Sequence, residues 1–187
     1  MPFDQGAPQF GLADAKVQTW ASAGTYSGSL TDIMSVQMIG FTLQQISAQL
    51  TGDDQITATD TRAIGGQVQM RFGGLNLDGL AVILGKAIAT ISSVEQQGIQ
   101  GGHRMPYFGI LARVLAAEGG GNTMLYVPKC KLMGDFQLAM LEYGVFAIPE
   151  VTVQCVPDAT YGIYNLITHP TDVAITVMPP LNIAAVT

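Results

Sequence analysis

Apolar and polar residues alternate at every second position in two neighbouring stretches of the chain, residues 33–50 and 64–72. This period of two predicts strands with one apolar and one polar face. In the first stretch, the apolar residues change from odd to even positions near Gln44–Gln45. A shift of one residue turns a strand over, so we expect a β-bulge there. The two stretches are expected to pair as antiparallel strands, joined by a loop at residues 51–63.

Residues 73–86 follow a helical spacing instead. Asn76 stands where it would cap the start of a helix, and Gly85 stands where it would cap the end. The expected helix is short, with about two turns. Because the apolar run is so short, a buried strand at residues 81–84 is the alternative.

The second half of the chain again shows strand patterns, separated by turn residues. Residues 107–115 form one expected strand, and the glycine-rich residues 118–122 form a turn. Residues 124–158 contain three more strands, interrupted by glycine and proline. Since no helix stands between successive strands, the pattern predicts a mainly β protein: a β-sandwich or barrel with one short flanking α-helix.

The two ends of the chain have little periodicity and are rich in small residues and proline. We expect residues 1–30 to form an extended N-terminal arm, with one strand near Lys16–Trp20. Residues 159–187 are expected to form a C-terminal arm, with one short strand at Val173–Val177. The domain between the arms would then span residues 31–158, which is enough chain for one substantial core.

The amount and sign of the charge in the sequence indicate which kinds of partner are expected. Charged residues make up only 12% of the sequence, against about 25% in typical globular domains, and the net charge is −6. A low surface charge indicates either a chain that is buried against other copies of itself or a compact monomer rich in serine, threonine and glutamine. The negative balance disfavours phosphate-driven binding of nucleic acid and attachment to an anionic membrane surface.

Targeting signals are not expected either. The N-terminal residues have neither a basic start nor an apolar run, so we expect no secretion signal. The longest apolar stretch, residues 80–91, is interrupted by Gly85 and Lys86 and is too short for a membrane anchor. A chain made in the cytoplasm would keep its two cysteines reduced.

The residue types that carry catalysis do not assemble into a recognisable motif. His103 and His169 have no nucleophile or second ligand at a motif spacing, so we expect no catalytic residue and no enzyme activity. Residues 79–87 resemble a phosphate-binding loop but have the wrong spacing between glycines and an alanine in place of the metal-binding hydroxyl. The acidic residues fit no calcium loop, so we expect neither a metal nor a cofactor.

Cys130 lies between two lysines, which would favour a reactive thiolate if all three side chains faced the same space. In a strand, however, Lys129 and Lys131 point one way and Cys130 points the other. We therefore expect Cys130 in the core and the lysines on a solvated or interfacial face. Neither cysteine belongs to a CxxC pair.

Residues 50–85, LTGDDQITATDTRAIGGQVQMRFGGLNLDGLAVILG, resemble the tail tube (major tail) proteins of long-tailed bacteriophages. The similar features are a Leu-x-Gly-Asp-Asp turn, a polar–apolar strand that ends in Phe-Gly-Gly-Leu, and a short helix that ends in Leu-Gly. PYFGILARV at residues 106–114 and LYVPKCKLMGDFQLAM at residues 125–140 extend the likeness. It covers roughly residues 33–157.

This resemblance implies the tail-tube fold, in which a β-sandwich-like subunit forms hexameric rings that stack into a tube. The rings would share a continuous β-barrel around a channel that holds the tape measure protein and later conducts double-stranded DNA, without specific binding, into the host. Tail-tip or baseplate proteins and a tail terminator protein would be the other partners. The chain would be assembled in the host cytoplasm and located in the tail of the virion.

The resemblance also gives the polar strand faces a role in viral genome ejection. Lysines in a channel wall would hold the phosphates of the duplex, whereas amides and hydroxyls would let it pass. The expected channel-lining residues are Gln45, Ser47, Gln49, Gln67, Gln69, Thr152 and Gln154. The acidic residues expected in a loop between rings or at the channel mouth are Asp53, Asp54 and Asp60. Arg71 departs from this pattern and would either pair with an acidic neighbour or lie at the ring edge.

Two other assignments remain open at this level. A tube protein from a contractile tail would share the fold, and only a sheath partner would separate the two. A virion decoration or receptor-binding β-domain is the alternative of a different class. It predicts exposed aromatic side chains in loops, whereas the aromatic residues of this chain are few and scattered.

Overall fold

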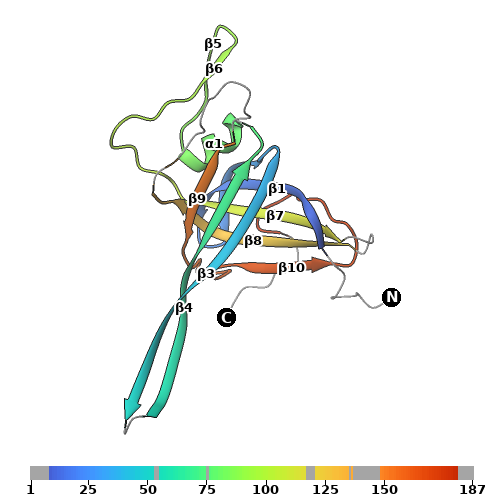
Figure 1. Ribbon diagram of the computed structural model, residues 1–187. Coiled ribbons are helices and arrows are strands. Elements are labelled where there is room, and N and C mark those ends of the chain that lie inside the picture. Colours follow the sequence, from blue (N-terminus) through green and yellow to red (C-terminus); the bar gives the residue numbers. More distant parts are fainter. Residues whose placement is uncertain are drawn as a thin grey trace.

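The computed structural model describes residues 9–52, 55–74, 76–116, 121–134, 136 and 148–180 (Figure 1). In this part of the chain the protein is mainly β, with one short helix. The elements are β1 (Gln9–Ser22), β2 (Thr25–Asp32), β3 (Val36–Gly52), β4 (Gln55–Phe72), α1 (Leu77–Leu84), β5 (Ala89–Ile91), β6 (Val94–Gln96), β7 (Phe108–Ala116), β8 (Asn122–Leu132), β9 (Glu150–Cys155) and β10 (Asn165–His169).

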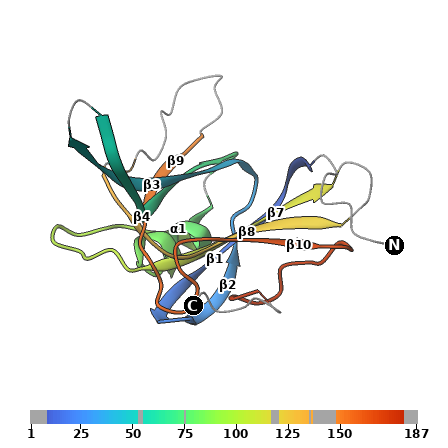
Figure 2. The same cartoon turned by 90° about the horizontal axis from the view of Figure 1, so that it is seen from below.

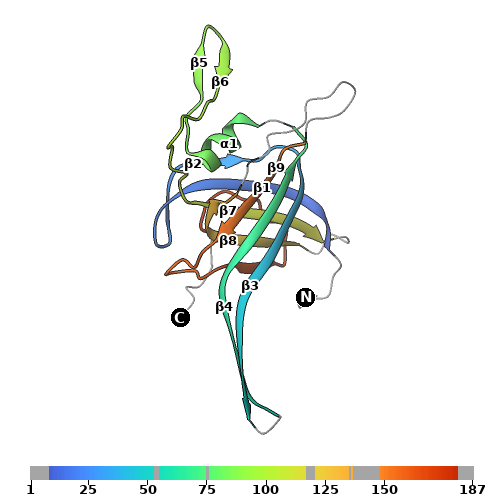
Figure 3. The same ribbon diagram turned by 60° about the vertical axis from the view of Figure 1, so that its left-hand side comes forward.

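Eight of the strands form one antiparallel sheet in the order β2-β1-β7-β8-β9-β4-β3, and β10 pairs with β8. Strand β10 runs beside β8 (Figure 2). The two short strands β5 and β6 form a separate hairpin. The sheet bends strongly, so that β3, β4 and β9 cross over β1, β7 and β8 at a steep angle (Figures 1 and 3).

The main core lies where the two parts of the bent sheet face each other. Alternation along β4 turns Val68, Met70 and Phe72 inward, and all three are buried. They pack in one cluster with residues of β1, β7, β8, β9 and α1. A second, smaller cluster on another face of β7 and β8 joins Leu111 and Tyr126 to the C-terminal segment.

The expected helix is confirmed together with both caps. The side-chain oxygen of Asn76 accepts a hydrogen bond from the backbone N–H of Gly79 (3.2 Å), and Gly85 ends the helix with a left-handed conformation (φ 65°). The amide nitrogen of Asn76 also donates to the carbonyl oxygen of Asp32 (2.8 Å), which joins the helix to β2. His103, which was expected to have no catalytic role, donates from Nε2 to the carbonyl oxygen of Leu84 at the other end (2.8 Å).

The expected N-terminal arm is wrong for residues 9–30. They form β1 and β2, which are integral strands of the main sheet, and Val17 is fully buried in the core. A single strand was expected only at Lys16–Trp20, because Gly11, Gly24 and Gly28 interrupt the pattern. These glycines have positive φ angles, so they allow the turn and the irregularities of β1 and β2 that a sequence pattern reads as an arm.

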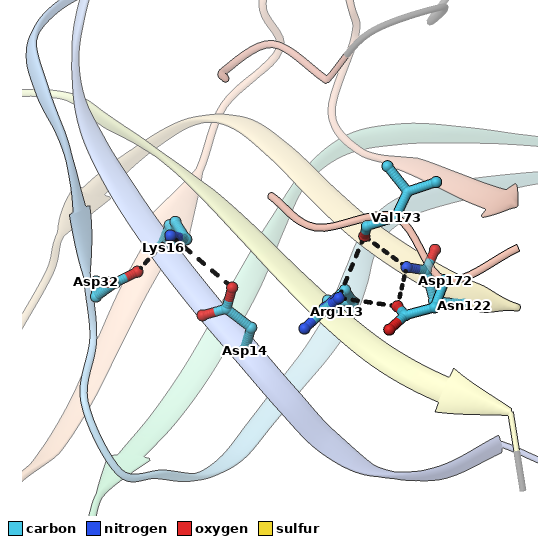
Figure 4. A network of polar contacts seen from close by, with 7 residues as sticks. All are labelled: Asp14, Lys16, Asp32, Arg113, Asn122, Asp172 and Val173. Carbon is cyan, nitrogen blue, oxygen red and sulfur yellow. Dashed lines mark hydrogen bonds and ion pairs between the residues drawn. The ribbon is translucent and has the colours of Figure 1, made fainter. Parts of the chain in front are cut away.

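The expected C-terminal arm is also partly wrong. The strand expected at Val173–Val177 is wrong, because these residues form no strand, and the strand of this region is β10 (Asn165–His169). Arg113 and Asn122 both donate hydrogen bonds to the carboxylate of Asp172 (2.8 and 2.9 Å) and to the carbonyl oxygen of Val173 (3.3 and 2.6 Å) (Figure 4). These bonds hold the segment against β7 and β8. Figure 4 also shows the ion pairs of Lys16 with Asp14 and Asp32.

The expectations for the loop at residues 51–63 and for the strands of the second half have different outcomes. The expected loop at residues 51–63 is mostly strand, because β3 and β4 pair as far as Gly52 and Gln55. The strand expected between β8 and β9 lies outside the described residues, and so does most of the turn expected at residues 118–122. The strands expected at residues 107–115 and at the two ends of 124–158 are confirmed as β7, β8 and β9.

A buried carboxylate connects the turn between β1 and β2 to the segment that follows β9. Asp158 accepts hydrogen bonds from the indole nitrogen of Trp20 (3.0 Å) and from the backbone N–H groups of Gly24 (3.2 Å), Thr160 (2.8 Å) and Tyr161 (3.1 Å). Burial by itself raises the pKa of Asp158, but these hydrogen bonds favour the charged form and outweigh it. The pKa of Asp158 therefore lies below its usual value.

Replacing the helix cap by Asn76→Ala should lower the free energy of unfolding by about 1 kcal/mol, because the N–H of Gly79 loses its acceptor. Urea unfolding of the variant and of the wild type measures this difference. Asn76→Asp is the matched control, since it keeps the capping oxygen and loses only the bond to Asp32. Equal losses in the two variants would contradict a capping role.

Asp158→Asn should destabilise the protein by about 1–3 kcal/mol near neutral pH, because the charged acceptor of several hydrogen bonds is lost. The folded pKa is lowered, so the carboxylate stabilises the fold above its unfolded pKa of about 4, and this contribution disappears as pH falls through the folded pKa. Urea unfolding across acidic pH should show the variant converging on the wild type. Glu95→Gln removes a carboxylate at an exposed residue of β6 and is the control, which should unfold at the same urea concentration as the wild type near neutral pH.

Candidate assembly surface

Strands β3 and β4 form a long two-stranded ribbon that extends well beyond the rest of the molecule (Figures 1 and 3). The pairing runs from Val36 opposite Phe72 to Gly52 opposite Gln55. Strand β9 supports only residues 66–71 of β4, so the distal half of the ribbon consists of two strands alone. Two-stranded ribbons in water are marginally stable by themselves, so this half is a candidate for a partner.

The distal half exposes large apolar side chains. Ile46, Leu50 and Ile64 have 59%, 65% and 56% of their surface exposed. Exposed apolar residues that stand singly need no explanation, but these three lie together on one projecting ribbon. Complete burial of each of these side chains would contribute roughly 1.5–3 kcal/mol of favourable free energy.

The edge of the sheet at β3 has an unusual composition. Its seventeen residues contain no charged residue and no proline. Among the described strands, only β4 pairs with β3. Natural proteins usually protect such an edge with lysine, proline, a short strand or a cover, because it offers N–H and C=O groups for pairing with another chain. Strand β3 lacks lysine and proline and is long, so its composition does not protect its edge.

A register shift occurs between Gln44 and Gln45, where the bulge was expected. Gln44 lies opposite Gly65 and Gln45 lies opposite Ala63, so the additional residue is Ile64 of β4. The expectation that β3 itself turns over is therefore wrong. Because alternation along β3 continues without interruption, the apolar residues beyond the bulge lie on the opposite face from those before it.

The ribbon is consequently amphipathic beyond the bulge, with each face defined by the register of its residue pairs. The hydroxyl groups of Ser47 and Thr61, which belong to the polar face, lie 3.1 Å apart. The polar face of the ribbon contains Gln45, Ser47, Gln49, Thr59 and Thr61. The apolar face of the ribbon contains Ile46, Ala48, Leu50 and Ala58, with Asp60 and Arg62 beside them.

The seven residues expected to line a channel fall into two groups. Gln67 lies opposite Gln154, and Gln69 lies opposite Thr152, so these four share one face of the sheet near its centre. By strand alternation this is the face opposite the core. The other three, Gln45, Ser47 and Gln49, belong to the polar face of the ribbon. The two groups therefore lie on opposite faces of the sheet, and the structure does not bring all seven residues together.

The acidic residues expected in one loop also separate. Asp60 lies within β4, not in a loop, and forms an exposed ion pair with Arg62 (2.8 Å). Asp53 and Asp54 lie outside the described residues. Arg71 pairs with Glu150, its cross-strand neighbour (3.2 Å), which agrees with the first of the two alternatives expected for it.

A basic and aromatic patch continues the face that carries Gln154. Lys131 lies opposite Gln154. The ammonium group of Lys129 lies 4.2 Å from the ring centre of Trp20 and 4.7 Å from that of Tyr107, which indicates cation–π contacts. The ammonium group of Lys131 lies 5.1 Å from the same tyrosine ring. As expected, the lysines lie outside the core and Cys130 lies within it.

The sequence offered no signal for this patch, because Trp20, Tyr107 and the lysines are far apart along the chain. Within the described ranges, no three His, Cys, Asp or Glu side chains gather as a metal site would require. No helix of the described part is long and apolar enough to cross a membrane. The distal ribbon and the edge of β3 are the strongest candidate surface for function, because they combine exposed apolar side chains with a strand that contains no charged residue.

No protein-family model matches the sequence, and no curated protein matches it.

Proposed function

We propose that the chain is the structural subunit of a bacteriophage tail tube. Copies would join through β3 and the apolar face of the ribbon into hexameric rings, which stack around a channel that conducts the viral genome. The observation that carries the proposal is the uncharged, seventeen-residue edge strand on a projecting amphipathic ribbon. The sequence resemblance to tail tube proteins supplies the ring, the tape measure protein, the tip and terminator partners, and the location in the virion.

The two faces of the ribbon suit two different neighbours. The apolar face would pack against an adjacent subunit and so remove Ile46 and Leu50 from water. The polar face would then point into the channel, where its amides and hydroxyls carry no charge that could hold phosphates. We place Gln45, Ser47 and Gln49 there in preference to Gln67, Gln69, Thr152 and Gln154, because two lysines accompany the latter group.

The decoration or receptor-binding alternative draws less support from the described residues. It predicts aromatic side chains free for a ligand, but several aromatic residues of the described part contact other rings of the chain. Trp20 stacks edge-on with Tyr107, Tyr26 and Tyr161 contact Tyr126, and Tyr164 contacts Phe41.

Two variants on adjacent residues test the assembly surface. Ile46→Lys with Ala48→Lys should prevent tubes or raise the concentration needed for assembly by at least about 10-fold, because lysines would be buried between subunits. Gln45→Lys with Gln49→Lys adds the same charge to the same strand on its other face and should still assemble. Negative-stain electron microscopy and light scattering of the purified proteins compare them, with the wild type as reference.

All four residues are exposed, so circular dichroism should show the same folded subunit in both variants. Equal assembly of the two variants would remove the apolar face from the interface. A wild-type protein that stays monomeric even when a purified tail-tip complex is added would contradict the tube proposal itself.

Particles built with Gln45→Lys and Gln49→Lys should release DNA more slowly than wild-type particles. The added ammonium groups would attract phosphates, so raised salt should restore the rate of release. Fluorescence of a DNA-binding dye measures release at low and high salt, and Gln45→Ser with Gln49→Ser is the neutral control. Wild-type rates from the lysine variant at low salt would show that these positions do not line the channel.

A further inference from the structure

The only two cysteines of the sequence lie opposite each other in the core. Cys130 of β8 and Cys155 of β9 are paired residues in the sheet, and their sulfur atoms are 3.2 Å apart. Both side chains are fully buried, and both thiols are free. Neither takes part in the proposed assembly surface.

Cys130 and Cys155 form a non-hydrogen-bonded pair, the type of cross-strand pair whose Cα atoms lie closer together. The backbone N–H of Val156 donates to the carbonyl oxygen of Lys129 (3.0 Å), so the adjacent residue pair is a hydrogen-bonded one. Antiparallel strands alternate the two types, which makes Cys130 and Cys155 a non-hydrogen-bonded pair. The Cα atoms of such pairs are typically about 4.5 Å apart, which lies at the short end of the range that a disulfide can bridge. A bond would require the sulfur atoms to approach by about 1 Å.

The pair also lies in the strand pairing that connects two parts of the sheet. Strand β9 pairs with β8 at three positions only, Cys130–Cys155, Lys131–Gln154 and Leu132–Val153. In the described part of the chain, this is the only strand pairing that connects β3, β4 and β9 with the rest of the sheet. A covalent bond here would fix the ribbon-bearing strands to the body.

We propose that Cys130 and Cys155 form a dithiol site that hydrogen peroxide closes slowly to a cross-strand disulfide, which ties β9 to β8. The proposal does not depend on the proposed function, because it rests only on the geometry of the two thiols. Hydrogen peroxide is the reactant that suits the site, since it is close to water in size and the thiols are buried.

The reaction balances with one peroxide molecule for each pair of thiols. One cysteine, after losing its proton, attacks a peroxide oxygen, the O–O bond breaks, and a sulfenic acid forms while the first water leaves. The second thiol then attacks that sulfur, the S–O bond breaks, and the S–S bond forms while the second water leaves. The thiols are oxidised by two electrons and the peroxide is reduced. The neighbouring thiol at 3.2 Å intercepts the sulfenic acid before further oxidation.

Burial raises the pKa of the Cys130 thiol, and the contact with Cys155 raises it further. The reactive thiolate is consequently rare at neutral pH, and the reaction should be slow there and faster as pH rises. Cytosolic reductants would keep the pair reduced, whereas an oxidising exterior would let it close.

The test exposes the intact, folded protein to hydrogen peroxide, then denatures it and alkylates all free thiols. The expected product resists alkylation, has lost two hydrogen atoms by mass, and yields a linked peptide that contains Cys130 and Cys155. Dithiothreitol should reverse it. Its melting temperature should exceed that of the reduced protein by roughly 5 °C, because the bond closes a loop in the unfolded chain.

Three variants serve as controls. In Cys155→Ala, Cys130 should stop at a sulfenic acid, which dimedone traps, or pass on to sulfinic acid. Cys130→Ala with Cys155→Ala shows how much of any thermal shift comes from the nine methionines. Cys155→Ser keeps the side-chain size if the alanine variant fails to fold. The wild-type experiment decides alone if no variant folds. Thiols that stay fully alkylatable after native exposure, sulfinic acid in the wild type, or disulfides between chains would each overturn the proposal.

Discussion

The packing of β4 and β9 against β1, β7 and β8 is the contact on which the rest of the structure depends. Val68 and Val153 on one side, and Val17 and Phe108 on the other, are all fully buried in a single cluster. Burial of such side chains supplies most of the favourable free energy of folding. Since only three residue pairs join β9 to β8, this core, more than the backbone pairing, sets the direction in which the ribbon projects.

The buried core stabilises the fold as a whole, so the distal half of the ribbon does not have to be stable by itself. Beyond the bulge, β3 and β4 expose apolar side chains and an uncharged edge, features that lower solubility in an isolated monomer. The same features become favourable once a neighbouring copy covers them. Strand β3 contains no charged residue, whereas β4 beside it carries the exposed ion pair of Asp60 with Arg62.

The two faces of β8 show how one strand can carry different chemistry on its two sides. Cys130 faces the core and meets Cys155, whereas Lys129 and Lys131 on the other side contact aromatic rings. Alternation separates the Cys130 thiol from the ammonium groups, and burial raises the pKa of that thiol. The thiol pair is consequently governed by burial and by its own contact.

The sequence by itself determined the features that depend on near neighbours along the chain. The helix between Asn76 and Gly85, its caps, and the alternation of β7, β8 and β9 all follow from local spacing. Tertiary structure decided which distant strands meet: β1 with β7, Cys130 with Cys155, and the extension of β4 through residues expected as a loop. Strand pairing brings together residues that are far apart in sequence. The periodicity of a strand predicts that it has an apolar and a polar face, but it does not predict which other strand pairs with it. The bulge shows the same limit, since the pattern located it near Gln44 but the added residue belongs to the partner strand.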